Sequence, residues 1–180
     1  MKWEFDFLYA LQNLHNPILN PVMVFLSLIG EAGIIWILAA IVFLCVRKYR
    51  SIGIQMVISM VATLIIGNLI LKNLIARDRP CWIDTEVALL VSNPKDYSFP
   101  SGHSMNGFTA AVTIFMNDRR LGSAALVLAL LIAFSRLYNF VHFPTVIIGG
   151  ICIGTAVAII VCMVWHRTEA IHSRWKFLGE

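Results

Sequence analysis

Three short polar segments interrupt an otherwise apolar sequence, and each carries residue types that can bind or transfer phosphate. The first reads KNLIARDRP, from Lys72 to Pro80. The second is SFPSGHS, from Ser98 to Ser104, and the third is SRLYNFVHFPTVIIGG, from Ser135 to Gly150. Their cations and free amides could bind a phosphate group, and their histidines could supply the acid and the nucleophile for phosphoryl transfer.

The cations of these segments are expected to converge on one anion. Lys72 and Arg79 are seven positions apart, so on a continuous helix they would lie on one face, two turns apart. Arg136 lies in an apolar run, where a cation needs a partner or an aqueous cavity. Because no acidic residue is near Arg136 in the sequence, a bound anion is the expected partner. For Lys72, the alternative is a charge that only fixes the end of a membrane span.

The remaining polar residues suit the start of two helices. Ser101 and Gly102 stand where a helix should begin, so free N–H groups and the helix dipole would favour an anion there. His103 adds a titratable proton donor, although a plain Ser N-cap followed by an interfacial His is the alternative. His142 precedes Pro144, a residue suited to the first turn of a helix. Carboxylates for a metal are almost absent from the three segments, so no metal or cofactor is expected.

Composition places these segments in a membrane protein. Of the 180 residues, 59% are hydrophobic and 13% charged, and the mean hydropathy is +0.79, which is outside the range of soluble domains. The apolar runs predict an all-α fold with six transmembrane helices in one bundle, forming a single domain over residues 1–180. The expected spans are 17–29, 31–46, 51–73, 103–116, 121–138 and 144–165.

The ends of the chain lie outside these spans. In residues 1–16, Trp3, Phe7, Leu11 and Leu14 recur at helical spacing, which predicts an interfacial helix or an extension of the first span. Residues 166–180 are expected to form a cytoplasmic tail. The four cysteines have no metal-type spacing, and a disulfide framework is not expected.

The distribution of basic residues predicts the orientation. Six spans would place both termini on one side, with nine Lys and Arg residues there and five on the other. The positive-inside rule then makes both termini cytoplasmic and places the three polar segments on the extracytoplasmic face of the cell membrane. The net charge of +4 follows from this topology, and no nucleic-acid partner is expected.

The order of the three segments resembles the type-2 phosphatidic acid phosphatase superfamily, also called the lipid phosphate phosphatases. The motifs are K-x6-R-P from Lys72, P-S-G-H from Pro100 and S-R-x5-H from Ser135. The resemblance implies a metal-independent phosphatase that acts through a phosphohistidine. Carried over by position, His142 would be the nucleophile and His103 the general acid. The phosphate oxygens would be bound by Lys72, Arg79, Arg136, Ser101 and Gly102.

One position departs from the family motif. The family has Asp four residues after the nucleophilic His, and this chain has Val146. The carboxylate would accept the Nδ1 proton and fix the imidazole tautomer. In the serine-protease triad, loss of the analogous carboxylate costs on the order of 10⁴ in rate. Three explanations stay open, namely a weakened natural member, an introduced substitution, or a substitute acceptor. The candidate acceptors are Asp78, Asp84, Asp96, Thr145 and a backbone carbonyl.

Two functions therefore follow from the sequence. The first is an enzyme that hydrolyses outer-leaflet lipid phosphates such as undecaprenyl pyrophosphate, phosphatidylglycerophosphate or phosphatidic acid. The second is a non-catalytic binder or carrier of lipid phosphates, which the missing carboxylate would favour. A vanadate-dependent haloperoxidase shares this type of motif set, but the hydropathy argues against it. The sequence determines neither the head group nor the oligomeric state.

Overall fold

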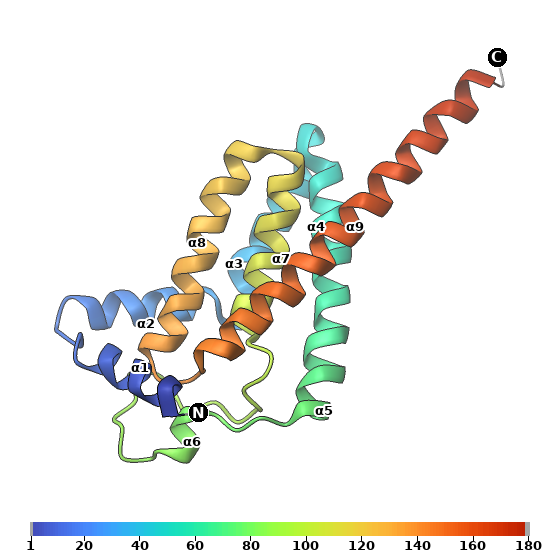
Figure 1. Ribbon diagram of the computed structural model, residues 1–180. Helices are drawn as coiled ribbons and strands as arrows, with labels where there is room; N and C mark the ends of the chain where they lie inside the picture. The colour runs from blue at the N-terminus through green and yellow to red at the C-terminus, as the bar shows by residue number, and fades with distance from the viewer. Residues whose placement is uncertain (1, 179–180) are drawn as a thin grey trace.

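The computed structural model describes residues 2–178, and within that range every regular element is helical, as the sequence predicts (Figure 1). The expected all-α membrane fold is confirmed at this level. The elements in chain order are α1 (Lys2–Gln12), α2 (Leu19–Ile29), η1 (Glu31–Gly33), α3 (Ile34–Cys45), η2 (Arg47–Tyr49), α4 (Arg50–Thr63), the π-helix η3 (Leu64–Leu71), α5 (Lys72–Ile75), α6 (Pro80–Ile83), α7 (Gly102–Asn117), α8 (Arg119–Tyr138) and α9 (Pro144–Leu178).

Helices occur at all six predicted spans, but six separate crossings are not confirmed. Three helical stretches are long and apolar enough to cross a membrane, namely Arg47–Ile83, Arg119–Tyr138 and Pro144–Glu169. A fourth candidate is the pair Leu19–Ile29 and Glu31–Cys45, bent by 46°. α2 has 11 residues and α3 has 12, so each is about 17 Å long against a hydrocarbon core of about 30 Å. Two helices that cross the membrane in opposite directions would meet at an angle far larger than 46°, so α2 and α3 are better described as one bent span.

α7 is the central helix, and α4, α8 and α9 all pack against it. Two glycines of α9 make the contact close. A Cβ atom at Gly154 would lie 2.3 Å from the backbone oxygen of Met105, and one at Gly150 would lie 2.9 Å from that of Ser101. Only a residue without a side chain allows this approach. The small residues of α9 therefore serve packing within the chain, and they fix the beginning of α7 beside α9.

α1 is a separate helix that packs at the lower end of the bundle in Figure 1, beside α6. Leu8 and Leu11 are buried in an apolar cluster with residues of α8 and α9, whereas Trp3 and Phe7 are exposed. The side chain of Gln12 donates a hydrogen bond to the backbone oxygen of Tyr138 at 3.0 Å. α1 thus does not continue into α2. It lies at the end of the bundle where α9 begins, while α9 runs to the opposite end (Figure 1).

Candidate active site

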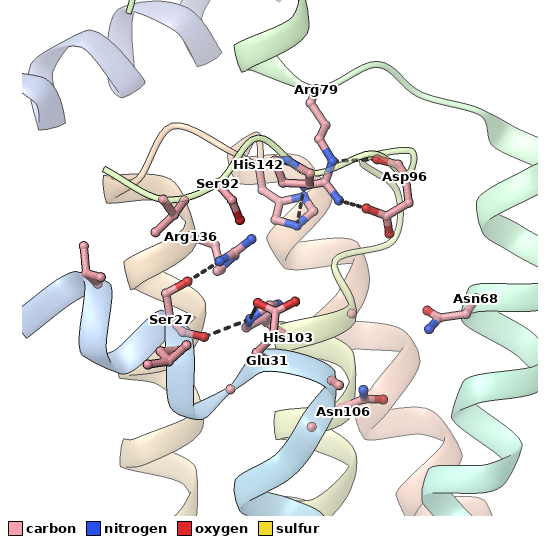
Figure 2. A pocket seen from close by; sticks show the side chains of 18 of the residues that line it. Ser27, Glu31, Asn68, Arg79, Ser92, Asp96, His103, Asn106, Arg136 and His142 are labelled. Carbon is pink, nitrogen blue, oxygen red and sulfur yellow. Dashed lines mark hydrogen bonds and ion pairs between the residues drawn. The ribbon is translucent and has the colours of Figure 1, made fainter. Parts of the chain in front are cut away.

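One polar cavity of about 510 Å³ lies at the end of the bundle where α7 begins and α8 ends. It is lined by Val24, Ser27, Leu28, Gly30, Glu31, Ala32, Gly33, Asn68, Lys72, Arg79, Leu90, Val91, Ser92, Pro94, Asp96, Gly102, His103, Asn106, Arg136 and His142. Every residue that the sequence predicted for the site lines this cavity except Ser101. Figure 2 shows the side chains of Arg79, Arg136, His103 and His142 turned toward one another. The three polar segments of the sequence therefore meet at one place.

Lys72 and Arg79 converge, but not by the route that the sequence suggested. α5 ends at Ile75, and Ala76 takes a left-handed conformation with φ 44°, so no continuous helix connects the two cations. Arg79 instead caps the N-terminus of α6. Asp96 joins them, because its carboxylate accepts from Lys72 Nζ and, at 2.8 Å, from Arg79 Nη2. Its backbone oxygen also accepts from Arg79 Nε at 2.6 Å.

Arg136 is a buried cation near the end of α8, with 5% of its surface exposed. Its Nη1 donates to the hydroxyl of Ser27, and among the described residues its Nε has no hydrogen-bond partner. No ion pair of Arg136 with a carboxylate occurs in that part of the chain either. A buried guanidinium with donors to spare, at the wall of a polar cavity, is suited to binding an anion. We call Lys72, Arg79 and Arg136 the phosphate clamp.

The beginning of α7 is a capped helix N-terminus. Ser101 is the N-cap, and its buried hydroxyl accepts from the backbone N–H of Ser104 at 3.4 Å. The hydroxyl of Ser101 thus serves the helix, as the simpler interpretation of this stretch predicts, while Gly102 and His103 face the cavity. His103 Nε2 donates to the backbone oxygen of Ser27 at 3.1 Å and lies 3.6 Å from a carboxylate oxygen of Glu31.

His142 lies in the loop between α8 and α9, with 1% of its surface exposed. Its Nε2 is 3.2 Å from Arg79 Nη1, and its Nδ1 is 3.2 Å from the hydroxyl oxygen of Ser98. Burial lowers the pKa of His142 well below its ordinary value, and the charges of Arg79 and Arg136 lower it further. The imidazole is therefore neutral near pH 7, the state that a nitrogen nucleophile requires.

Val146 is fully buried in the apolar cluster that α1, α8 and α9 share. The hydrogen bonds of the His142 ring in the described residues go to Arg79 and Ser98, and none goes to the four side chains considered as substitute acceptors. Asp96 binds the clamp, and Asp84 accepts from the hydroxyl of Tyr9. Thr145 accepts from Arg77 and donates to Glu4. The residue beside Nδ1 is Ser98, the first residue of the SFPSGHS segment, for which the sequence predicts no role.

Sequence reasoning also missed Ser27, Glu31, Asn68 and Asn106. Each is a polar residue in or beside an apolar helix, and Glu31 is the only Asp, Glu, Lys or Arg between Asp6 and Arg47. Isolated polar residues in membrane segments are a usable signal for a functional site. Asn68 lies in the π-helix η3, a rare element that often occurs at such sites.

A second, apolar cavity of about 260 Å³ lies between α3 and α4. It is lined by Ala32, Ile37, Ala40, Ile41, Val57, Met60, Val61, Leu64 and Asn106. Ala32 and Asn106 also line the polar cavity. The two cavities therefore adjoin each other, one suited to a charged group and the other to a hydrocarbon chain.

The chain is similar to known phosphatases in sequence. Residues 52–170, more than half of the chain, match the model of the PAP2 superfamily. An undecaprenyl-diphosphatase of Sulfolobus acidocaldarius is 36% identical over 138 residues, which are 76% of this chain and 66% of the relative. The chain thus spans about two thirds of that protein's length. Phosphatidylglycerophosphatase B of Bacillus subtilis is 30% identical over 153 residues, covering 78% of this chain and 72% of the relative.

Two solved structures share the fold. The first is a transmembrane PAP2-type phosphatidylglycerolphosphate phosphatase from Bacillus subtilis, with a TM-score of 0.75 and 26% identity over 92% of this chain and 86% of that one. LpxE of Aquifex aeolicus has a TM-score of 0.73 and 24% identity over 89% of this chain and 95% of its own, and it supports the fold alone. The family resemblance drawn from the three motifs is confirmed, and so is the expectation of a phosphatase.

Proposed function

The chain belongs to the PAP2 superfamily, and we propose that it hydrolyses lipid phosphates at a membrane surface, with undecaprenyl diphosphate as the first candidate substrate. The observation that carries the proposal is the convergence of Lys72, Arg79 and Arg136 with two histidines at one cavity. Relatives named undecaprenyl-diphosphatase include the Sulfolobus protein and BcrC of Bacillus subtilis. The adjoining apolar cavity supports a substrate with a hydrocarbon chain.

The proposed reaction has two steps. In the first, Nε2 of neutral His142 attacks the terminal phosphorus and an N–P bond forms. The bond from that phosphorus to the bridging oxygen breaks, and the lipid leaves with this oxygen, as undecaprenyl phosphate in the case of the diphosphate. His103 gives a proton to the departing oxygen. In the second, water attacks the phosphohistidine, the N–P bond breaks, and inorganic phosphate leaves. His103, now neutral, accepts the proton of that water.

The phosphate clamp would neutralise the charge that develops on the nonbridging oxygens. The backbone N–H of Gly102, at the N-terminus of α7, is a further donor to the same group. Ser101 contributes indirectly, because its hydroxyl caps the helix that presents Gly102 and His103. None of these roles requires a metal or an organic cofactor.

The proposal is tested by phosphate release from undecaprenyl diphosphate, phosphatidylglycerophosphate and phosphatidic acid, using purified protein in detergent with a chelator. We expect turnover that the chelator leaves unchanged and that His142→Ala removes. Activity lost to the chelator would contradict the metal-free mechanism. Full activity of His142→Ala would contradict the assignment of the nucleophile.

A second candidate function is a non-catalytic binder or carrier of lipid phosphates, favoured by the apolar side chain of Val146. It predicts micromolar or tighter affinity for the same lipids without turnover. Turnover appearing only in Val146→Asp would support the binder. Turnover by the unaltered chain would exclude it.

We further propose that the chain forms one domain with five crossings: the bent α2–α3 pair, α4–α5, α7, α8 and α9. The clamp residues at the site end already have a local role in the proposed mechanism. Five other basic residues lie at the opposite end of the bundle, at the α3–α4 and α7–α8 junctions, namely Arg47, Lys48, Arg50, Arg119 and Arg120. The positive-inside rule then makes that opposite end cytoplasmic, with the site extracytoplasmic. α1 would lie at the outer interface, unlike in the six-crossing arrangement with cytoplasmic termini.

Cysteine labelling separates the two arrangements. In a background without the native cysteines, Lys95→Cys should react with a membrane-impermeant maleimide in intact cells, and Lys48→Cys only after permeabilisation. Lys2→Cys should react in intact cells if there are five crossings and should be protected if there are six. Labelling of Lys48→Cys from outside would invert the proposed orientation.

A further inference from the structure

Ser98 contacts the ring nitrogen of His142 that Arg79 does not contact. Its side chain is fully buried, and its hydroxyl oxygen is 3.2 Å from His142 Nδ1. We propose that Ser98 is the positioning residue that holds the orientation of His142 by accepting its Nδ1–H, in the place of the carboxylate that the family has at position 146. This inference rests on the proposed function, because it concerns how the proposed nucleophile is prepared.

The contacts of the ring settle which nitrogen carries the proton. Arg79 Nη1 lies 3.2 Å from His142 Nε2, and a guanidinium can only donate hydrogen bonds. Nε2 must therefore accept, so the single proton of the neutral ring is on Nδ1. The Nδ1–H then donates to the hydroxyl oxygen of Ser98. The lone pair of Nε2 is directed toward the clamp, where a phosphorus atom bound by these cations would be attacked.

The position of Ser98 is fixed by its surroundings. Its backbone N–H donates to the backbone oxygen of Arg77 at 2.7 Å. Arg77 is itself held by an ion pair with Glu4 at 2.8 Å and by a hydrogen bond to Thr145 at 2.7 Å. The ring of the next residue, Phe99, packs so closely on α9 that a Cβ atom at Gly149 would lie 2.4 Å from it. Because the backbone on both sides of Ser98 is held in place, its hydroxyl stays beside Nδ1 and can orient the imidazole.

A hydroxyl and a carboxylate differ in what they contribute when His142 is phosphorylated. The ring becomes cationic as the N–P bond forms, and its Nδ1–H becomes a stronger donor. Ser98 can accept this hydrogen bond, and the proton stays on Nδ1 throughout. As a neutral group it stabilises the cation less than a carboxylate would. The unaltered chain should therefore be active but slower than Val146→Asp, which has both the hydroxyl of Ser98 and a carboxylate at position 146.

The first test is steady-state kinetics of Ser98→Ala, with Ser59→Ala as the matched control. Ser59 is also fully buried and hydrogen-bonded, but it lies on α4 and takes no part in the site. We expect Ser98→Ala to lower kcat by about 10-fold to 100-fold, the range for groups that orient a reactive ligand, with KM within about twofold. Ser59→Ala should change neither. Equal effects of the two substitutions would overturn the proposal.

The second test is a double-mutant cycle with Val146→Asp. If the new carboxylate takes over Nδ1, Ser98→Ala should cost less than about threefold in the Val146→Asp background, because two groups that serve one atom are not additive. Equal losses in both backgrounds would show that Ser98 acts on something other than Nδ1. Thermal unfolding of each variant in detergent checks that the fold is retained.

The third test does not depend on turnover. In protein labelled with ¹⁵N-histidine, the His142 signals, assigned by comparison with His142→Ala, should show the Nδ1–H tautomer. In Ser98→Ala the Nδ1–H loses its acceptor while Arg79 keeps the tautomer, so the ¹H and ¹⁵N signals of this group should shift toward those of an N–H without a hydrogen bond. Unchanged Nδ1–H signals would overturn the proposal even if the kinetics changed. Conversely, the expected shift in a protein without phosphatase activity would support the role of Ser98 and contradict only the proposed function.

Discussion

Replacing Arg136 by Lys separates a specific phosphate contact from a simple positive charge. The guanidinium uses one nitrogen to bind Ser27, while its Nε has no partner among the described residues. Arg can therefore direct two N–H groups at one phosphate, and Lys retains the charge without this planar pair. With only 5% of residue 136 exposed, little water could replace a lost donor.

The expected loss follows from the number of hydrogen bonds. One charge-assisted hydrogen bond contributes about 1.5–3 kcal/mol, which corresponds to a decrease of about 10-fold to 150-fold in kcat/KM. The inhibition constant of orthovanadate, an analogue of the phosphoryl transition state, should rise by a similar factor. Arg120→Lys, at the opposite end of the bundle, is the charge-conserving control and should be neutral. A loss below about threefold in Arg136→Lys would mean that Arg136 only ends a membrane span.

Two further predictions concern stability. Because the pKa of folded His142 is lowered, the unfolded chain binds more protons below pH 6.5, so the midpoint of thermal unfolding should fall as the pH decreases from about 6.5. His142→Asn should flatten this dependence, and an unchanged slope would contradict the assigned direction. Gly154→Val should destabilise the fold by about 1–3 kcal/mol through the clash with the backbone of Met105, whereas Ala156→Val on the exposed face of α9 should not.

Much of the site could be predicted from the sequence because its chemistry is carried by rare residue types. A cation or histidine within an apolar run is costly unless it has a function, so Arg136 and His142 stand out in the sequence. The start of α9 at Pro144 and the N-cap at Ser101 follow from backbone rules that act over a few residues. Local chemistry is therefore a reliable guide to these positions.

What failed were inferences that need distances across the chain. The convergence of Lys72 and Arg79 depends on a helix end at Ala76 and on Asp96, 17 residues beyond Arg79, neither of which periodicity reveals. The number of crossings is not confirmed either, because run length does not show that α2 and α3 form one bent pair. Ser98 was overlooked because a serine is common in loops and gains meaning only from its contact with His142.

The carboxylate of Asp96 occupies two of the cations that are expected to bind phosphate, Lys72 and Arg79. Burial would raise the pKa of its carboxyl, but the bonds and charges of Lys72 and Arg79 outweigh burial and lower it. The carboxyl therefore stays ionised even at pH values somewhat below its ordinary pKa, and it is bound to two of the three clamp cations. A phosphate group that binds these cations must displace it or share them.

Asp96→Asn should therefore strengthen the binding of phosphate analogues. The contact from Arg79 Nε goes to the backbone oxygen of Asp96, so the substitution removes the negative charge and keeps this support. The side chain of Asp96 is 53% exposed, so solvent reduces the effect to about 1 kcal/mol, or about fivefold in the inhibition constant of orthovanadate. Asp84→Asn, which makes the same change at the Tyr9 contact outside the cavity, is the control. Weaker vanadate binding by Asp96→Asn would instead show that the carboxylate is needed to organise the clamp.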